Sequence, residues 1–228
     1  MTSGYAACRR RLQCAASGMV LALCATLALP WGPGAQAAPE PATEKGHSTV
    51  LDIGDSLSAA YGLASEQGWV ALTQARIDSA HPGWRVVNAS VSGETTAGGA
   101  ARIVDAVSRH RPDVVVIALG ANDGLRGLPP AQMRINLARM IGAAHGVGAE
   151  VLLIGMRMPP NLGADYTRQF EQSYRVLAER FDTRLLPFLL EPIALDRNSY
   201  QSDNLHPVAE AQPSLRDHVW EALEPMLR

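Results

Sequence analysis

The chain has 228 residues, of which 47% are hydrophobic and 18% are charged, and its formal net charge is −2. This composition is typical of a globular protein and excludes a disordered or collagen-like chain. Aromatic residues make up only 5%, and lysine and arginine do not cluster beyond the first dozen residues, so we expect no nucleic-acid partner.

Residues 1–37 have the pattern of a secretory signal peptide. Three arginines at 9–11 precede an uncharged, mainly apolar run over 15–31, and the tripeptide Ala-Gln-Ala at 35–37 supplies an A-x-A cleavage site. A membrane anchor is the alternative, but the run is shorter than the roughly 20 apolar residues that span a bilayer. We therefore predict cleavage after residue 37 and a periplasmic or secreted protein without a stable membrane anchor.

Two other export routes remain open from the same residues. The arginine run is compatible with a twin-arginine signal, and Cys24 with lipoprotein processing, although leucine stands where a small residue should precede that cysteine. Cleavage after residue 37 would remove all three cysteines and three arginines, leaving 17 basic and 22 acidic residues and a net charge of −5. The mature chain would then need no disulfide and would hold no zinc–thiolate site.

Residues 38–47 are polar and contain two prolines, which predicts a short tether before one domain at residues 48–228. Within this domain, apolar runs alternate with longer segments of helical periodicity. We expect strands at 48–54, 84–91, 112–120, 149–156 and 183–190, and helices at 68–80, 97–110, 130–148, 164–181 and 208–227. This alternation predicts an α/β fold with a parallel sheet covered by helices on both faces.

In such a sheet, ligands bind at the carboxyl ends of the strands. Four of the six histidines precede strands, and His218 lies inside the last predicted helix. Only His206 follows a strand and precedes a helix. Its segment, Asp203–Pro207, shares the spacing D-x-x-H-P with the segment Asp78–Pro82, but the latter ends a helix on the opposite edge.

The loops on the functional edge carry the groups that acyl transfer requires. Ser56 follows the first strand, and a serine hydroxyl becomes a nucleophile when a base takes its proton. His206 can act as this base, with Asp203 accepting a hydrogen bond from its ring. The backbone N–H groups of Ser56 and Gly93 and the side-chain amide of Asn122 can donate to an oxyanion. Taken singly, each residue is also compatible with an ordinary turn or helix cap.

Four blocks in this order resemble the SGNH (GDSL) hydrolases: "GDSLS" around Ser56, "SGET" around Gly93, "GAND" around Asn122 and "DNLHP" around His206. The resemblance covers essentially the whole mature chain. It implies a flavodoxin-like three-layer α/β/α sandwich with a five-stranded parallel sheet, no metal and no cofactor. It also implies Ser56 as nucleophile, Gly93 and Asn122 as oxyanion donors, Asp203 and His206 completing the triad, and hydrolysis of fatty-acyl esters and thioesters. Asp52 departs from the family pattern, which has an apolar residue there.

Further expectations concern the substrate. The loop at 156–166 is long, lies on the functional edge and offers Met158, Pro160 and Leu162 as one wall of an acyl groove; the alternative is that its methionines only complete the core. The small residues at 58–60 predict a helix that starts close to the sheet. We expect a monomer with a small acyl ester or thioester as substrate. The alternatives are a carbohydrate O-acetyl esterase and a non-catalytic ligand-binding protein on a flavodoxin-like fold.

Overall fold

The computed structural model describes residues 46–228; the predicted signal peptide and most of the tether lie outside them. Five parallel strands form one sheet with the order β2-β1-β3-β4-β5. The strands are β1 (Ser48–Gly54), β2 (Trp84–Asn88), β3 (Val114–Ala118), β4 (Glu150–Ile154) and β5 (Arg184–Leu186). The domain limits proposed from the sequence stay a prediction.

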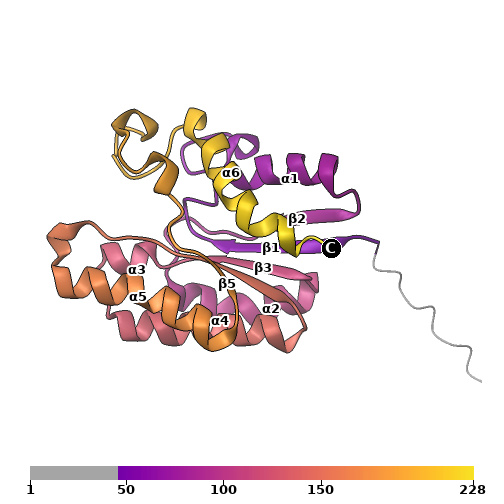
Figure 1. Cartoon of the computed structure of the whole chain (residues 1–228), viewed down its shortest axis with the longest axis horizontal. Coiled ribbons are helices and arrows are strands. Elements are labelled where there is room, and N and C mark those ends of the chain that lie inside the picture. The colour runs from indigo at the N-terminus through magenta and orange to yellow at the C-terminus, as the bar shows by residue number, and fades with distance from the viewer. Residues whose placement is uncertain (1–45) are drawn as a thin grey trace, which may run out of the picture. The chain divides into compact units, whose positions relative to one another are not determined.

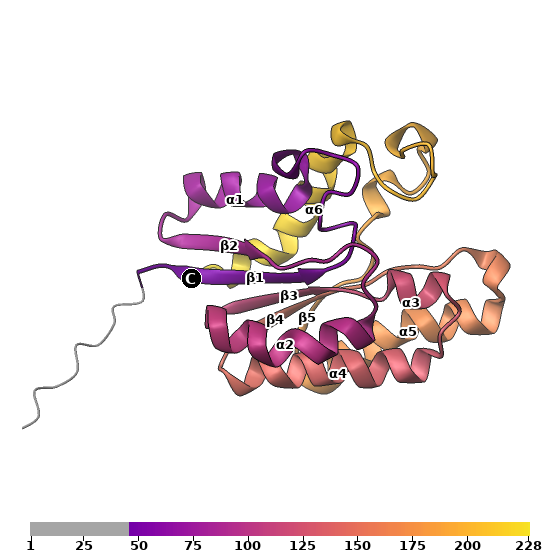
Figure 2. The same cartoon turned by 180° about the vertical axis from the view of Figure 1, so that it is seen from behind.

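Helices cover both faces of the sheet (Figures 1 and 2). One face carries α1 (Trp69–Ala80) and α6 (Gln212–Leu223), which pack on each other. The other carries α2 (Thr96–His110), α4 (Pro130–Gly146) and α5 (Ala164–Phe181). The predicted three-layer α/β/α sandwich with a five-stranded parallel sheet is confirmed. None of the helices in residues 46–228 combines the length and the hydrophobicity needed to cross a bilayer.

The core lies on both sides of the central strands. All five residues of β3 are buried, as the apolar run in its sequence predicts for a strand covered on both faces. In β1, Leu51 and Ile53 are fully buried. Burial of such a side chain contributes about 1.5–3 kcal/mol, so this layer holds the ends of β1 and β3 in fixed positions.

The strand order changes direction between β1 and β3, because β2 lies on one side of β1 and β3, β4 and β5 lie on the other. Ligand sites of such sheets form at the carboxyl ends of the strands flanking this point. The segment after β1 begins with Asp55 and Ser56, and the segment after β3 leads through Gly120 into the short helix α3 (Ala121–Leu125). The topology therefore brings Ser56 and Asn122 to the same place.

The structure corrects the helix expected directly after Ser56. This segment forms hydrogen-bonded turns, in which the N–H groups of Ser58 and Ala59 donate to the carbonyl of Asp55. Ala60 has a left-handed backbone conformation, with φ of 55°, which a continuing right-handed helix cannot contain. Small side chains therefore serve a compact turn here.

Four of the five strands are shorter than predicted: β3 covers Val114–Ala118 rather than 112–120, and β4 covers Glu150–Ile154 rather than 149–156. β2 ends at Asn88 rather than at residue 91, and β5 has three residues rather than eight. Pro187 follows β5 and lacks the N–H group that a strand would use, so the chain turns away. The last helix, expected at 208–227, begins as α6 only at Gln212, and Pro213 lies in its first turn, where a proline without an N–H group is tolerated.

Candidate active site

Ser56, His206 and Asp203 lie in one chain of hydrogen bonds. The Nε2 atom of His206 is 2.9 Å from Ser56 Oγ, and its Nδ1 atom is 2.7 Å from Asp203 Oδ2. The serine follows β1, and the other two residues lie about 150 positions later, in the loop before α6. The three residues singled out from the sequence thus meet at the predicted edge of the sheet.

The loop that carries His206 is organised by the Asp203 carboxylate. While Oδ2 contacts the imidazole ring, Oδ1 accepts hydrogen bonds from the backbone N–H groups of Leu205 and His206 at 2.9 and 3.0 Å. The hydrogen bond with the His206 side chain, followed by those two N–H groups, lowers the pKa of Asp203 to about 2. The carboxylate, which is also partly exposed to solvent, therefore stays ionised at neutral pH.

Two further residues hold His206, and the sequence analysis missed both. The ring of Tyr61 packs on the imidazole with a centroid separation of 4.4 Å. Gln201 donates from Nε2 to the carbonyls of Tyr61 and Pro207, and its N–H donates to the carbonyl of His206 at 2.7 Å. Gln201 thus joins the turns after β1 to the histidine loop. The position of Tyr61 on the functional edge was the only available signal.

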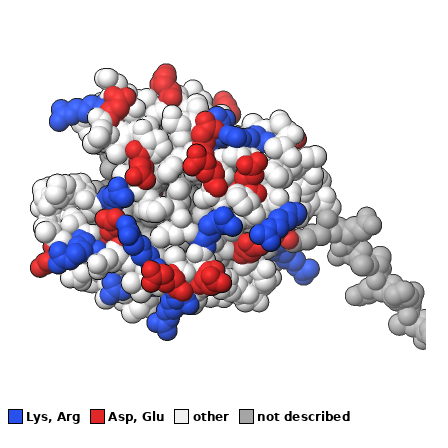
Figure 3. All heavy atoms as spheres, viewed as in Figure 1, with Lys and Arg blue, Asp and Glu red and all other residues white. Residues whose placement is uncertain are grey.

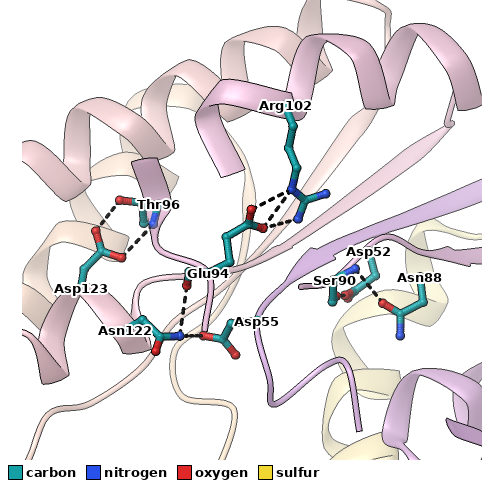
Figure 4. Close-up of polar contacts among 9 residues, drawn as sticks. All are labelled: Asp52, Asp55, Asn88, Ser90, Glu94, Thr96, Arg102, Asn122 and Asp123. Atoms are coloured by element: carbon teal, nitrogen blue, oxygen red, sulfur yellow. Dashed lines mark hydrogen bonds and ion pairs between the residues drawn. The ribbon is translucent and has the colours of Figure 1, made fainter. Parts of the chain in front are cut away.

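Asn122 lies in α3 with its side chain directed toward the end of β1 (Figure 4). Its Nδ2 atom donates to the backbone carbonyl of Glu94 at 3.0 Å and to Asp55 Oδ2 at 3.3 Å. Asp55 also accepts from the N–H of Leu57, so it braces the turns at residues 55–60 that carry Ser56, here called the nucleophile turn. Burial raises the pKa of Asp55 to about 6, while the Leu57 N–H, the charge of His206 and Asn122 oppose the rise.

Gly93 occupies a tight turn between β2 and α2. The N–H of Glu94 donates to the carbonyl of Val91, and Gly93 has a positive φ of 78°, as the third residue of a type II turn requires. Arg126 donates to the Gly93 carbonyl at 3.0 Å. Arg102 forms a bidentate ion pair with the Glu94 carboxylate (Figure 4). These contacts hold the turn that contains the Gly93 N–H.

A cavity of about 460 Å³ opens beside Ser56 and His206. Its polar lining also includes Asn122, Arg157, Arg197, Tyr200 and Asn204. Its apolar lining consists of Leu57, Ala121, Leu125, Met156, Met158, Pro159, Phe188, Leu190, Ala194 and Leu205. On the face drawn in Figure 3, acidic and basic side chains are interspersed and do not form one patch. The cavity offers an apolar space next to a polar reacting group.

Of the three residues predicted to bind substrate, Met158 lines the cavity, whereas Pro160 and Leu162 do not. Met158 lines the cavity, where its sulfur lies against Gly124, and it is also almost fully buried. Pro160 lines a separate hollow beside α5, and Leu162 ends a short 3₁₀ helix at Pro160–Leu162 without contributing to the cavity lining. The opposite wall comes from the segment after β5, around Phe188 and Leu190, which the sequence analysis had assigned to the strand itself.

Comparisons with known proteins agree on one family. A profile described as the GDSL-like lipase/acylhydrolase family matches residues 53–212. The chain is 48% identical over 179 residues to esterase TesA of Pseudomonas aeruginosa, covering 78% of this chain and 89% of that protein. It is 38% identical to thioesterase 1/protease 1/lysophospholipase L1 of Escherichia coli K12, covering 78% and 85%.

A solved structure agrees as well. The crystal structure of the psychrotrophic esterase EstA from Pseudoalteromonas sp., inhibited by monoethylphosphonate, superposes with a TM-score of 0.76 at 38% sequence identity. The match covers 79% of this chain and 98% of that one. From the profile, the relatives and the shared fold, we conclude that this chain belongs to the GDSL-like lipase/acylhydrolase family, the SGNH hydrolases, and is an enzyme of the ester and thioester hydrolase class.

Proposed function

We propose that the chain is an exported serine hydrolase that cleaves acyl esters and thioesters with Ser56 as nucleophile. One observation carries this proposal: the hydrogen-bonded series Ser56–His206–Asp203 opens onto a largely apolar cavity. A nucleophile, a base and a group that orients the base are the parts that acyl transfer uses. The names of the relatives, which include an esterase and a thioesterase, support the same class of substrate.

In the first half-reaction, Ser56 Oγ attacks the acyl carbonyl carbon while His206 Nε2 takes the hydroxyl proton. Asp203 stabilises the imidazolium that forms and keeps Nε2 directed at the serine. The protonated ring then gives its proton to the leaving alkoxide or thiolate as the tetrahedral intermediate collapses, which leaves an acyl-enzyme on Ser56. In the second half-reaction, His206 activates a water molecule that releases the acid by the same steps in reverse.

The negative oxygen of the intermediate is assigned to three donors: the N–H groups of Ser56 and Gly93 and the Nδ2 of Asn122. The shorter hydrogen bond from Nδ2, to the Glu94 carbonyl, orients this amide before substrate arrives, and the second N–H transfers from Asp55 Oδ2, at 3.3 Å, to the oxyanion. Preorganised donors of this kind stabilise developing charge, and loss of one typically lowers the rate by about 10²- to 10³-fold.

The acyl chain is assigned to the cavity between the segment after β4 and the segment after β5. Its lining of leucine, methionine, phenylalanine and proline side chains favours a hydrocarbon chain over a sugar. A volume of about 460 Å³ is larger than an acetyl group needs, so the cavity supports acyl chains of medium length or longer. Export through the N-terminal signal remains part of the proposal and rests on the sequence of residues 1–37.

The test is hydrolysis of p-nitrophenyl esters from acetate to palmitate by residues 38–228, beside Ser56→Ala. Ser65→Ala is the matched control, because Ser65 is exposed in the short 3₁₀ helix at Ser65–Gln67. We expect activity on medium and long chains that Ser56→Ala loses by about 10⁴-fold or more and Ser65→Ala keeps. Activity confined to acetate would favour an O-acetyl esterase. Equal rates for the Ser56→Ala variant and the unaltered protein would show that Ser56 is only a turn residue.

A further inference from the structure

Asp52 is a carboxyl group in the middle of a buried strand, and the mechanism above makes no use of it. It lies two residues before Gly54 in β1, is 1% exposed, and is in register with Asn88 of β2 and Val116 of β3. A buried carboxyl group without hydrogen bonds would cost free energy. Its contacts therefore indicate what it stabilises.

One oxygen of Asp52 is bound to the segment that leads to Gly93. Ser90 Oγ donates to Asp52 Oδ1 at 2.5 Å (Figure 4). Around this contact, backbone hydrogen bonds extend the pairing of the two segments beyond the end of β2, from Ala89 N to Asp52 O and from Val91 N to Gly54 O. Ser90 directly precedes the Val91–Glu94 turn, so the Asp52 carboxyl anchors the entry to the turn that holds the Gly93 N–H.

The other oxygen of Asp52 lies near the turn that carries the nucleophile. Asp52 Oδ2 and Ser58 Oγ are both buried, and neither has a hydrogen-bond partner within residues 46–228. A Cβ atom placed on Gly54 would lie 2.4 Å from Ser58 Oγ and 2.9 Å from Ser90 Oγ, so both hydroxyls converge over this glycine. The Asp52 carboxyl thus lies between one hydroxyl from each of two catalytic turns.

We propose that Asp52 is a positioning residue that acts as a neutral carboxylic acid and links the nucleophile turn to the Gly93 turn. Its Oδ1 accepts from Ser90, and a proton on Oδ2 is donated to Ser58 Oγ after a small rotation of either group. A Ser58 hydroxyl that donated to Oδ2 would satisfy the same two atoms, but it would leave a buried carboxylate that forms no ion pair within residues 46–228, and the neutral acid avoids this cost. Through the two turns, the acid sets the spacing between Ser56 and the Gly93 oxyanion donor.

The surrounding charges are consistent with a neutral acid. Burial raises the pKa of Asp52 to about 7, and the hydroxyls of Ser90 and Ser58 only partly oppose this rise. Of the charged groups around it, Asp55 raises the pKa further, and Arg102 lowers it to a smaller extent. Arg102 is itself paired with Glu94, which reduces the positive charge available to stabilise a carboxylate.

The raised pKa of Asp52 determines how its contribution to stability depends on pH. The folded protein keeps the Asp52 proton between the ordinary pKa of 3.8 and about 7, where the unfolded chain releases it. The stability that this proton contributes is therefore complete below pH 3.8 and is lost as the pH rises through 7. Above that pH, the hydrogen bond with Ser58 persists only if Ser58 donates to a buried carboxylate, and the cost of burying that charge weakens the link between the turns.

The experiment compares Asp52→Asn, Asp52→Leu and Ser90→Ala in the mature protein. Asparagine keeps an acceptor for Ser90 and a donor for Ser58 at every pH, whereas leucine keeps neither. At pH 6 we expect Asp52→Asn to retain kcat within about 3-fold, and Asp52→Leu to lose about 10-fold or more in kcat with little change in KM. The ratio of wild-type kcat to Asp52→Asn kcat should fall between pH 6 and 9. Ser90→Ala should also lower kcat, and it provides the test if Asp52→Leu does not fold.

A second readout does not depend on ester hydrolysis. The infrared difference spectrum of the wild type minus Asp52→Asn at pH 5.5 should contain the C=O band of a protonated carboxyl group. Absence of this band would overturn the proposal, as would an unchanged kcat in both Asp52→Leu and Ser90→Ala, or an Asp52→Asn variant as slow as Asp52→Leu. The rate assays rest on the proposed function, whereas the spectrum does not, so a wild type without esterase activity would count against the function alone.

Discussion

Two segments of this chain share the spacing D-x-x-H-P, and only one of them lies at the proposed active site. In the segment Asp203–Pro207, the aspartate contacts its own histidine at 2.7 Å, and the other ring nitrogen of that histidine reaches Ser56 Oγ. In the segment Asp78–Pro82, Asp78 instead accepts a hydrogen bond from Gln74. The difference arises from the elements that carry the two segments.

The surroundings of the two histidines are similar at first sight. His81 has an aromatic neighbour, Trp220, at a centroid distance of 5.8 Å and a carboxylate, Glu224, at 3.8 Å. His206 has Tyr61 and Asp203 in these roles. His81, however, caps the C-terminal end of α1 on the edge of the sheet that holds the strand beginnings, and no serine hydroxyl within residues 46–228 is hydrogen-bonded to its ring. An acid and an aromatic ring therefore lie beside both histidines, and the proposed base His206 differs in the serine hydroxyl that is hydrogen-bonded to its second ring nitrogen.

Replacement of the two histidines is the sharpest test of this comparison and carries the largest expected effect. His206→Ala removes the base, and we expect kcat for a medium-chain p-nitrophenyl ester to fall by about 10⁴-fold or more. His81→Ala is the matched control and should leave kcat within about 2-fold, because surface substitutions away from a site rarely matter. Comparable losses in both variants, with unchanged circular dichroism, would contradict the assignment of the base.

Replacement of the two aspartates should produce a smaller difference in kcat than replacement of the two histidines. Asp203→Asn keeps the shape of the loop but offers the ring an amide, which stabilises neither the imidazolium nor its tautomer, so kcat should fall by about 10²- to 10⁴-fold. Asp78→Asn should have no measurable effect. Since the pKa of Asp203 is about 2, the wild-type carboxylate is ionised throughout pH 5–9, so the loss in Asp203→Asn should persist at every pH in this range. An Asp203→Asn variant with wild-type kcat throughout this range would contradict the role of Asp203.

The distinction between the two segments was available from the sequence, because alternating strands and helices assign each loop to one edge of the sheet. The same reasoning brought Ser56, Gly93 and Asn122 together. Periodicity could not show that the residues after Ser56 form turns, since small residues suit both a helix start and a turn. Leu162 was predicted to line the acyl groove only because it lies in a loop on the functional edge, whereas the path of that loop depends on packing against α5.

Asp52 and Tyr61 show a different limit of sequence reasoning. The polarity of Asp52 was visible as a departure from an apolar strand, but its contact with Ser90 depends on how far the pairing of β1 continues beyond β2. Tyr61 carries no signal beyond its place on the functional edge. Its contact with His206 arises because Gln201 ties two loops together that are about 140 residues apart in the sequence.

The ring of Tyr61 provides the last and smallest prediction. Aromatic contacts contribute about 0.5–1.5 kcal/mol, so Tyr61→Leu should lower kcat by roughly 2- to 10-fold by loosening the orientation of His206. Tyr61→Phe should remain within about 2-fold, because it keeps the ring and because Gln201 donates to the backbone carbonyl of this residue and not to its hydroxyl. A Trp220→Leu variant, which removes the aromatic neighbour of His81, should change stability but not kcat at saturating ester. If Tyr61→Phe were as slow as Tyr61→Leu, the hydroxyl of Tyr61 and not its ring would be the group that acts on His206.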